Sequence, residues 1–230
     1  MTAIRHPMKL SIIVPVFNEA DTLPVLLMRL LPWVRQGCEV IIVDGGSEDG
    51  SGDIAQCAGF TVLRSARGRA RQMNAGAARA TGTILLFLHA DTQLPDSAAA
   101  LVAQALSGKQ CWGRFDVCIV GRPVMLRVVG PMMNLRSRLT GIATGDQAMF
   151  VSRAAFDMVG GFPDQPLMED VELSRRLRAL SRPVCITRCA STSGRRWETH
   201  GVWRTILLMW RLRWQYWRGV PASQLAQAYR

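Results

Sequence analysis

The sequence lacks the patterns that mark small metal-binding modules and membrane-spanning helices. Its six cysteines form no Cys-x-x-Cys pair and its three histidines fall at no metal-finger spacing, which excludes a zinc-finger module. No stretch of about 20 residues is free of charge, which argues against a spanning helix. The apolar run 10–16 is short and no small-residue cleavage site follows it, so we interpret it as a strand rather than a signal peptide. We therefore expect a cytosolic chain with reduced, mostly buried thiols.

Acidic residues are scarce near the C-terminus. The chain of 230 residues has a net charge of +11, yet residues 171–230 alone hold 12 Arg against 2 Glu. The first 170 residues are therefore nearly neutral, which excludes a protein that is basic all over, such as a histone-like DNA binder. A hydrophobic content of 49% with 20% charged residues excludes a disordered chain.

The chain also lacks a Gly-, Ser- or Pro-rich linker and any short repeat. We expect one domain over residues 1–200, followed by a basic amphipathic helical appendage over 201–230. Apolar runs alternate with helical patterns, which predicts an α/β fold with a mostly parallel sheet flanked by helices. Strands are predicted at 10–16, 39–43, 60–64, 83–88, 112–120 and 145–152, with a short strand beyond Pro183. Helices are predicted at 21–35, 53–58, 68–80, 96–106, 124–139, 169–180 and 202–217, with an Arg-rich turn at 193–197.

Polar motifs follow three of the predicted strands. They are Pro15-Val16-Phe17-Asn18-Glu19, the stretch from Asp44-Gly45-Gly46 to Gly50, and His89-Ala90-Asp91. A strand-end carboxylate can accept hydrogen bonds from a base or ribose, or bind Mg²⁺ or Mn²⁺. Taken singly, each motif also fits a helix cap or a turn. Because ligands bind beyond the carboxyl ends of parallel strands, we expect the three motifs to share one crevice.

Together these segments resemble the family 2 glycosyltransferases, which have the GT-A fold. Three motifs of that family have counterparts here: the Pro-x-Phe-Asn-Glu end of the first strand, the Asp-Gly-Ser-x-Asp-Gly pattern, here with one extra Gly, and the Asp-x-Asp metal motif. In the last of these, His89 replaces the first Asp. The resemblance covers about residues 9–180 and is strongest to a small single-domain bacterial branch that carries Gly-Arg-x-x-Gln-Met-Asn, found here at 68–74.

The resemblance implies roles for individual residues. Those implied to bind the nucleotide-sugar donor are Pro15, Phe17, Glu19, Asp44, Gly45, Arg69 and His89. Asp91 would hold the divalent cation, Mn²⁺ or Mg²⁺, and the imidazole of His89 favours Mn²⁺. Those implied to face the acceptor or the donor sugar are Gly145, Asp146, Gln147 and Glu169.

Asp170 would be the general base of an inverting displacement. An acidic residue at a helix start is also favoured by the helix dipole alone, so a capping role stays open. Arg195, Arg196 and Trp197 would contact the leaving diphosphate or the acceptor. The sequence does not identify the acceptor, the sugar of the donor or the nucleotide base of the donor. Two alternatives are a catalytically idle nucleotide-sugar binder or membrane-associated scaffold, and a nucleotidyltransferase, which would need a Gly-rich basic loop after the first strand.

The predicted helix at 202–217 combines an aromatic stripe with arginines. Its Trp203, Trp210, Trp214 and Trp217 recur at helical spacing, and arginines lie on another face. This pattern suits the surface of an anionic membrane, and we expect the chain to be peripheral on the inner face of the cell membrane. Packing against the chain's own domain or against a second subunit in a homodimer is the alternative. Nucleic acid is not expected as a partner, because no reader motif accompanies the arginines.

Overall fold

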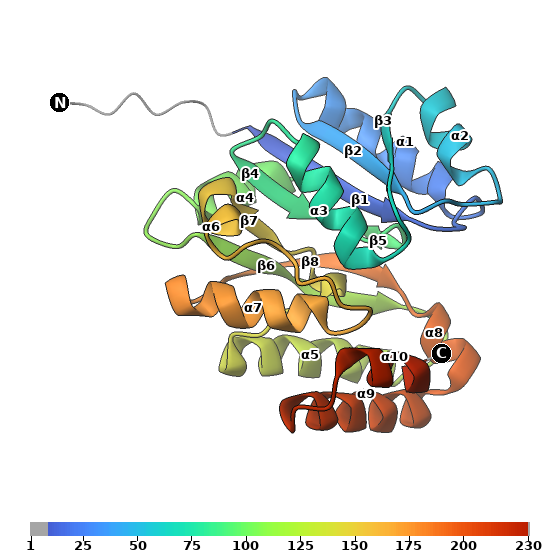
Figure 1. Cartoon of the computed structure of the whole chain (residues 1–230), viewed down its shortest axis with the longest axis vertical. Coiled ribbons are helices and arrows are strands. Elements are labelled where there is room, and N and C mark those ends of the chain that lie inside the picture. Colours follow the sequence, from blue (N-terminus) through green and yellow to red (C-terminus); the bar gives the residue numbers. More distant parts are fainter. Residues whose placement is uncertain (1–8, 230) are drawn as a thin grey trace.

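The computed structural model describes residues 9–229, in which a mixed sheet has the strand order β3-β2-β1-β4-β7-β6-β8-β5 (Figure 1). The strands are β1 (Leu10–Val16), β2 (Glu39–Asp44), β3 (Thr61–Arg64), β4 (Ile84–Phe87), β5 (Thr92–Gln93), β6 (Trp112–Val120), β7 (Phe150–Ser152) and β8 (Val184–Ser193). The first four strands run parallel, and β6 and β8 are also parallel to each other. The short strands β5 and β7 are antiparallel to their neighbours. The predicted α/β fold with a mostly parallel sheet is confirmed.

Helices cover both faces of the sheet because its central strands are apolar on both sides. On β1, Ile12 and Val14 point into one core and Ile13 points into the other. The first core is closed by α1 (Leu23–Arg35), α2 (Ser51–Cys57) and α4 (Ala98–Ala105). The second is closed by α3 (Arg69–Arg79), α6 (Arg153–Met158) and α7 (Glu169–Leu180). The helix α5 (Leu126–Thr140) packs on β6 and lies below α7 in Figure 1.

Two stretches differ from their predicted structure. The predicted strand at 145–152 is wrong in its first half, where Gly145–Gln147 forms a 3-10 turn. Here the Gln147 side chain accepts a hydrogen bond from the Thr144 N–H, and Ala148 has a φ of 44°, so the backbone cannot stay extended. The Arg-rich turn at 193–197 is instead the start of the helix α8 (Arg195–His200).

The expectation of reduced thiols is wrong for one pair of cysteines. Cys118 of β6 and Cys189 of β8 form a disulfide, with a Cα–Cα distance of 5.7 Å. The two residues are 71 positions apart in the sequence, and a bulge between Phe115 and Asp116 sets the strand register that brings them together. The expectation of mostly buried thiols is also wrong, because Cys57 is exposed and the remaining free cysteines are half-buried.

The C-terminal residues form a helical hairpin of α9 (Val202–Trp217) and α10 (Ala222–Tyr229). Leu212 of α9 and Leu225 of α10 are buried together with Leu167 and Met168, the two residues that precede α7. The hairpin therefore packs on the segment that leads into α7, at the lower end of the molecule in Figure 1. Among residues 9–229, no helix has the length and apolar character needed to cross a membrane.

Candidate functional site

The strands that carry the three polar motifs are neighbours in the sheet. β1 pairs in parallel with β2 on one side and with β4 on the other, so their carboxyl ends meet at one edge. Hydrogen bonds join the loops there: the N–H of Asn18 donates to Ser47 Oγ at 3.0 Å, and the N–H of Glu19 donates to Ser51 Oγ at 2.9 Å. The structure thus brings together the segments that the sequence predicted to share a crevice.

Asp44 ends β2, but its carboxylate is turned into its own loop. Oδ1 accepts hydrogen bonds from the backbone N–H of Ser47 at 3.0 Å and from its hydroxyl at 2.5 Å. Asp44 is only 4% exposed, and Gly52 gives its other oxygen just enough room. The structure therefore supports the turn interpretation of this motif, in which the Ser47 loop uses Oδ1, while Oδ2 accepts no hydrogen bond among the described residues and is the oxygen left for a base.

Two arginines flank the loop after β1. The Arg67 guanidinium lies 4.0 Å from the centre of the Phe17 ring, and Arg195 Nη2 lies 3.6 Å from Glu19 Oε1. The start of α8 is thereby held at the edge of the sheet, far from β1 in the sequence. Pro15 lies inside β1 opposite Val43, so it shapes the strand rather than the loop.

The polar side chains of the 68–74 segment tie α3 to the surrounding elements. Gln72 is buried, and its Nε2 donates to the carbonyls of Val16 and Val43 at 2.8 Å each, which bridges the ends of β1 and β2. The Gln72 amide also packs against Gly45, where a Cβ would lie 3.0 Å from it. Asn74 donates to and accepts from the backbone of Phe162. Arg69 Nη1 reaches Glu169 Oε1 at 3.4 Å. This segment therefore fixes the ends of β1 and β2, the loop at Phe162 and the start of α7 relative to one another.

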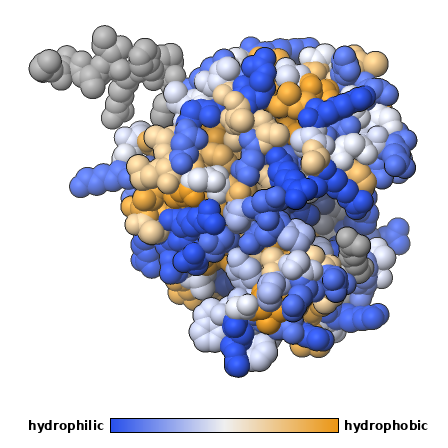
Figure 2. Space-filling model, viewed as in Figure 1, coloured by the Kyte–Doolittle hydropathy of each residue, from blue (hydrophilic) through white to orange (hydrophobic). Residues whose placement is uncertain are grey.

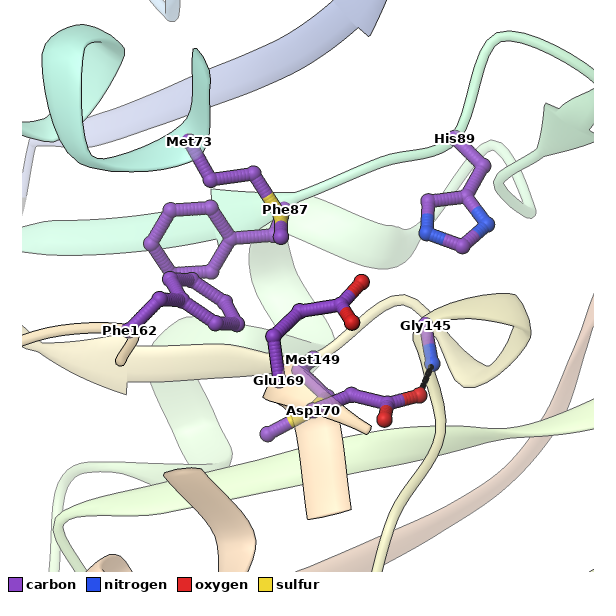
Figure 3. A pocket seen from close by; sticks show the side chains of 8 residues that line it. All are labelled: Met73, Phe87, His89, Gly145, Met149, Phe162, Glu169 and Asp170. Carbon is purple, nitrogen blue, oxygen red and sulfur yellow. Dashed lines mark hydrogen bonds between the residues drawn. The ribbon is translucent and has the colours of Figure 1, made fainter. Parts of the chain in front are cut away.

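A pocket lies where β4, α3 and the start of α7 converge. Its lining residues are Met73, Phe87, His89, Gly145, Met149, Phe162, Glu169 and Asp170. Figure 3 shows an apolar wall of Phe87, Phe162 and Met73 facing a polar side, where the carboxylates of Glu169 and Asp170 and the ring of His89 point toward a common space. The pocket thus brings Gly145, Glu169 and Asp170 together with His89, whereas Asp91, the predicted metal residue, is not among its lining residues.

Asp170 has the properties of a base at neutral pH. Its Oδ2 accepts a hydrogen bond from the Gly145 N–H at 2.8 Å, and its Oδ1 accepts one from the Val171 N–H at 2.7 Å. Burial, followed by the negative charge of Glu169, raises the pKa of Asp170 to about 6, and the two hydrogen bonds and Arg69 only partly oppose this rise. A carboxylate with this pKa is ionised at pH 7 yet basic enough to accept a proton.

His89 and Asp146 form the opposite side of the polar wall. His89 Nδ1 lies 3.4 Å from Asp146 Oδ1. Burial alone would raise the pKa of Asp146, but the hydrogen bond and charge of His89 hold it below its usual value. Gly145 packs directly against His89, because a Cβ there would lie 2.2 Å from the imidazole ring. The Gly145 backbone is therefore fixed between His89 and Asp170.

Gln147 does not face the pocket. It is fully buried, and its side chain accepts from the Thr144 N–H and donates to Asn134 Oδ1 at 3.2 Å. In this arrangement Gln147 fixes the turn that carries Gly145 and Asp146, and its implied contact with the acceptor or the sugar stays a prediction. The sequence could not show this, because Asn134 comes from a helix that precedes the turn.

Asp91 lies in the loop that follows β4 and is partly exposed. Its carboxylate accepts one long hydrogen bond, from Thr92 Oγ1 at 3.3 Å. Residues 9–229 contain no cluster of three His, Cys, Asp or Glu side chains that could hold a metal alone. A divalent cation of the Mg²⁺ type is commonly held by one or two carboxylates together with substrate phosphates. The free oxygen of Asp91 fits that arrangement, in which the donor diphosphate supplies further ligands.

The remaining residues implied to contact the leaving group or the acceptor lie on α8. Arg196 stacks on the Tyr229 ring at 3.7 Å and donates to the Tyr229 carbonyl at 2.9 Å. Burial raises the pKa of Tyr229, and the charge of Arg196 opposes this. Trp197 is half-buried on the same helix. Arg196 is therefore engaged by the C-terminal residue of α10, a partner for which the sequence gave no signal.

Arg136 of α5 was not singled out from the sequence. Its Nε and Nη2 atoms are buried and have no hydrogen-bond partner among residues 9–229. Burial lowers the pKa of this guanidinium, and the negative charges of Asp170 and Asp146 oppose that change. An arginine with unused donors near the pocket carboxylate of Asp170 is an available anion contact. The sequence gave no hint of this, because Arg127 and Arg138 of the same helix are exposed and Arg138 is ion-paired with Asp116.

Comparisons with known proteins agree on the family. The family model described as glycosyl transferase family 2 matches residues 11–156. An uncharacterized glycosyltransferase of Mycobacterium tuberculosis is 34% identical over 193 residues, which cover 78% of this chain and 72% of that protein. The undecaprenyl-phosphate 4-deoxy-4-formamido-L-arabinose transferase of Pseudomonas fluorescens is 32% identical over 154 residues. That match covers 59% of this chain and 44% of the relative, so this chain corresponds to less than half of that protein.

The fold agrees with a solved structure. The mannosyltransferase of Pyrobaculum calidifontis, in complex with GDP-Man and Mn²⁺, superposes with a TM-score of 0.63 at 22% sequence identity, over 82% of this chain and 57% of that chain. The likeness identifies the GT-A fold, as the strand-end motifs predicted. With the family model spanning most of the sheet, this chain belongs to glycosyl transferase family 2.

Proposed function

We propose that this glycosyltransferase moves a sugar from a nucleotide-diphosphate sugar to an acceptor hydroxyl, with inversion at the anomeric carbon. The observation that carries the proposal is Asp170, a pocket carboxylate with a pKa of about 6 held by the backbone N–H groups of Gly145 and Val171. In the displacement, the acceptor oxygen bonds to the anomeric carbon as the bond to the diphosphate oxygen breaks. The electron pair of that bond leaves on the diphosphate, and Asp170 takes the acceptor proton.

The donor would lie across the carboxyl ends of β1, β2 and β4. Phe17, Glu19 and the Asp44-Gly45 turn border the nucleoside side, and Arg69 lies between that side and Glu169. Arg69 and Arg195 each form one long ion pair at 3.4–3.6 Å and are about half exposed, so they can turn toward a diphosphate at small cost. The solved relative binds GDP-Man, which supports a nucleotide-diphosphate donor of this kind.

Asp91 is the residue we assign to a divalent cation shared with the donor. Such a cation, Mn²⁺ or Mg²⁺, would stabilise the negative charge that builds on the departing diphosphate. His89 lies two residues earlier and is paired with Asp146, so we assign it to positioning the turn that carries Gly145 rather than to metal binding.

A second acceptor class is a lipid phosphate. The unpaired donors of Arg136 beside Asp170 favour an anionic acceptor, and the Pseudomonas fluorescens relative is named for undecaprenyl phosphate. A phosphate oxygen is already ionised at neutral pH, so this reaction would need no general base. The effect of replacing Asp170 therefore distinguishes the two acceptor classes.

The test is nucleotide-sugar turnover in the presence of Mn²⁺, screened over UDP-, GDP- and dTDP-sugars. Asp170→Asn should lower kcat by about 10²–10⁴-fold with little change in donor KM if the acceptor is a hydroxyl. Asp91→Ala should raise the Mn²⁺ concentration that activity requires. NMR of the product made by the wild type should show an inverted anomeric centre. Asp157→Asn, an exposed acid on α6, is the matched control and should behave as wild type. Equal Mn²⁺ dependence in wild type and Asp91→Ala would remove the metal assignment.

A further inference from the structure

The helix α9 exposes a continuous apolar stripe to solvent. Its residues are Trp203, Leu207, Trp210, Trp214 and Trp217, each more than half exposed. They recur every three or four positions, so they lie on one side of the helix, whereas Thr205 and Leu212 on the other side are buried. Figure 2 shows pale and orange side chains among blue ones over the lower part of the molecule, where the hairpin lies. The stripe is therefore not used to pack α9 on its own domain.

The helix α5 exposes a second stripe of the same kind. Its members are Met132, Leu135 and Leu139 within the helix and Val128 near its start, with Val124 just before it, each about half exposed or more. The opposite side of α5, including Val129 and Gly130, is buried on β6. The two helices begin close together: the Arg122 N–H, just before α5, donates at 2.7 Å to Glu198 of α8, and α8 leads into α9. From there both helices run in the same direction in Figure 1.

Neither helix contains an acidic residue. Arg127 and Arg138 are exposed on α5, and Arg204, Arg211 and Arg218 are exposed along α9 beside its stripe. We name the exposed stripes and these arginines together the two-helix face. Its chemistry is apolar, aromatic and positive: Arg138 is ion-paired with Asp116 of β6, whereas the other four arginines have no acidic partner among the described residues.

The charge decides between two occupants of this face. In a symmetric dimer the same patch meets itself, so the arginines of one copy would be placed near those of the other. An anionic bilayer offers negative headgroups for the arginines and an apolar interior for the tryptophans and aliphatic side chains. Large exposed apolar patches of this kind mark interaction sites rather than free surface. The complementarity therefore favours the lipid surface over a second copy.

We propose that the two-helix face binds the surface of an anionic lipid bilayer, with the apolar stripes of α5 and α9 buried in the headgroup region. The inference is independent of the proposed transfer reaction, because it rests on surface residues that are not in the pocket. The buried side of α9 packs with Leu167 and Met168, directly before Glu169 and Asp170. A helix is about 10 Å thick, so the lipid surface would lie about one helix diameter from the catalytic segment.

The experiment is co-sedimentation of the full chain with vesicles of phosphatidylcholine containing 0, about 20 or about 40% phosphatidylglycerol, a series chosen because surface charge sets the binding of basic segments. We expect binding that rises with phosphatidylglycerol content and weakens in high salt. Trp210→Glu on α9 and Met132→Glu on α5 should each lower the partition coefficient by about tenfold, because each removes apolar contact and adds a charge that anionic lipid repels. The triple variant Arg204→Gln, Arg211→Gln, Arg218→Gln should lose most of the dependence on phosphatidylglycerol.

Met28→Glu on α1 is the matched control. Met28 is 65% exposed, close to the 66% of Trp210, and it also has an arginine neighbour, but it lies on a different helix in the upper part of the molecule. Its binding should equal that of wild type. The proposal is overturned if no vesicle binds the wild type, or if Met28→Glu weakens binding as much as Trp210→Glu. It is equally overturned if Trp210→Glu dissociates a dimer, seen by analytical ultracentrifugation, without changing vesicle binding.

Discussion

The backbone N–H of Gly145 donates a hydrogen bond to Oδ2 of Asp170 across 2.8 Å, and so joins the turn after α5 to the first residues of α7. Gly145 also packs against His89 at the end of β4. Three segments that are far apart in the sequence are therefore fixed relative to one another by a residue without a side chain. The orientation of the Asp170 carboxylate depends on this turn as well as on its own helix.

Activity should fall below about pH 6 because Asp170 must be ionised to accept a proton. Its pKa is raised from the ordinary value to about 6, so at lower pH the protonated fraction grows and kcat/KM falls about tenfold per pH unit. Removing the neighbouring charge with Glu169→Gln should move this acidic limb to lower pH, because Glu169 contributes to the rise. The measurement is the pH dependence of kcat/KM for both proteins.

Glu172→Gln serves as the control for that experiment. Glu172 lies on the same helix but pairs with Arg175 and Arg176 outside the pocket. Its pH profile should overlay that of wild type. An acidic limb that stays in place in Glu169→Gln would contradict the coupling between the two pocket carboxylates.

Gly145→Ala should reduce turnover strongly while leaving the chain folded. A Cβ would lie 2.2 Å from the His89 ring, so either His89 or the turn must move, and the hydrogen bond to Asp170 moves with it. A displacement of about 1 Å at a catalytic group can cost about 10²-fold in rate. Steady-state kinetics and thermal unfolding should be measured together. Gly108→Ala, where the added Cβ would meet only the end of the Gln110 side chain, should change neither; unchanged kinetics in Gly145→Ala would show that the turn does not control Asp170.

The strand ends could be predicted from the sequence because the signals that define them are local. The apolar run of β1 stops at Phe17, and the run of β2 stops at Asp44, so the edge of the sheet is visible in the order of residue types. The parallel pairing of β2, β1 and β4 then follows from the intervening helices. For the same reason the start of α7, with two acids at its first positions, was placed correctly at Glu169.

Long-range pairing explains what the sequence did not reveal. Gln147 was expected to face a substrate, but its partner Asn134 lies on α5, and only the folded chain shows that the two are buried together. The Cys118–Cys189 disulfide likewise depends on the register between β6 and β8. The stacking of Arg196 on Tyr229 depends on the return of α10 to the start of α8. None of these partners has a sequence spacing that could be recognised in advance.

Gln72→Ala should weaken both folding and donor binding. The Gln72 side chain donates to the carbonyls that end β1 and β2, and its loss removes one donor from each of them, although the Val16 carbonyl keeps the Gly45 N–H. The expected loss of unfolding free energy is about 2 kcal/mol, measured by urea denaturation. Donor KM should rise, because the Asp44-Gly45 turn packs on this amide. Gln104→Ala, at an exposed position of α4, is the matched control; equal losses in the two variants would mean that the bridge contributes nothing.

Arg136→Met should stabilise the folded chain and, if Arg136 binds the acceptor, weaken acceptor binding. The buried Nε and Nη2 of Arg136 have no partner among the described residues, and burial lowers the pKa of the group, so the folded state bears the cost of a desolvated charge. Methionine fills similar space without that cost, and the unfolding free energy should rise by about 1–2 kcal/mol. If the unused donors serve an anionic acceptor, acceptor KM rises at the same time while donor KM stays constant. Arg29→Met, at an exposed position of α1, should change neither quantity. A fall in stability for Arg136→Met would instead show that the charges of Asp170 and Asp146 already compensate the guanidinium, and that it serves the fold rather than a ligand.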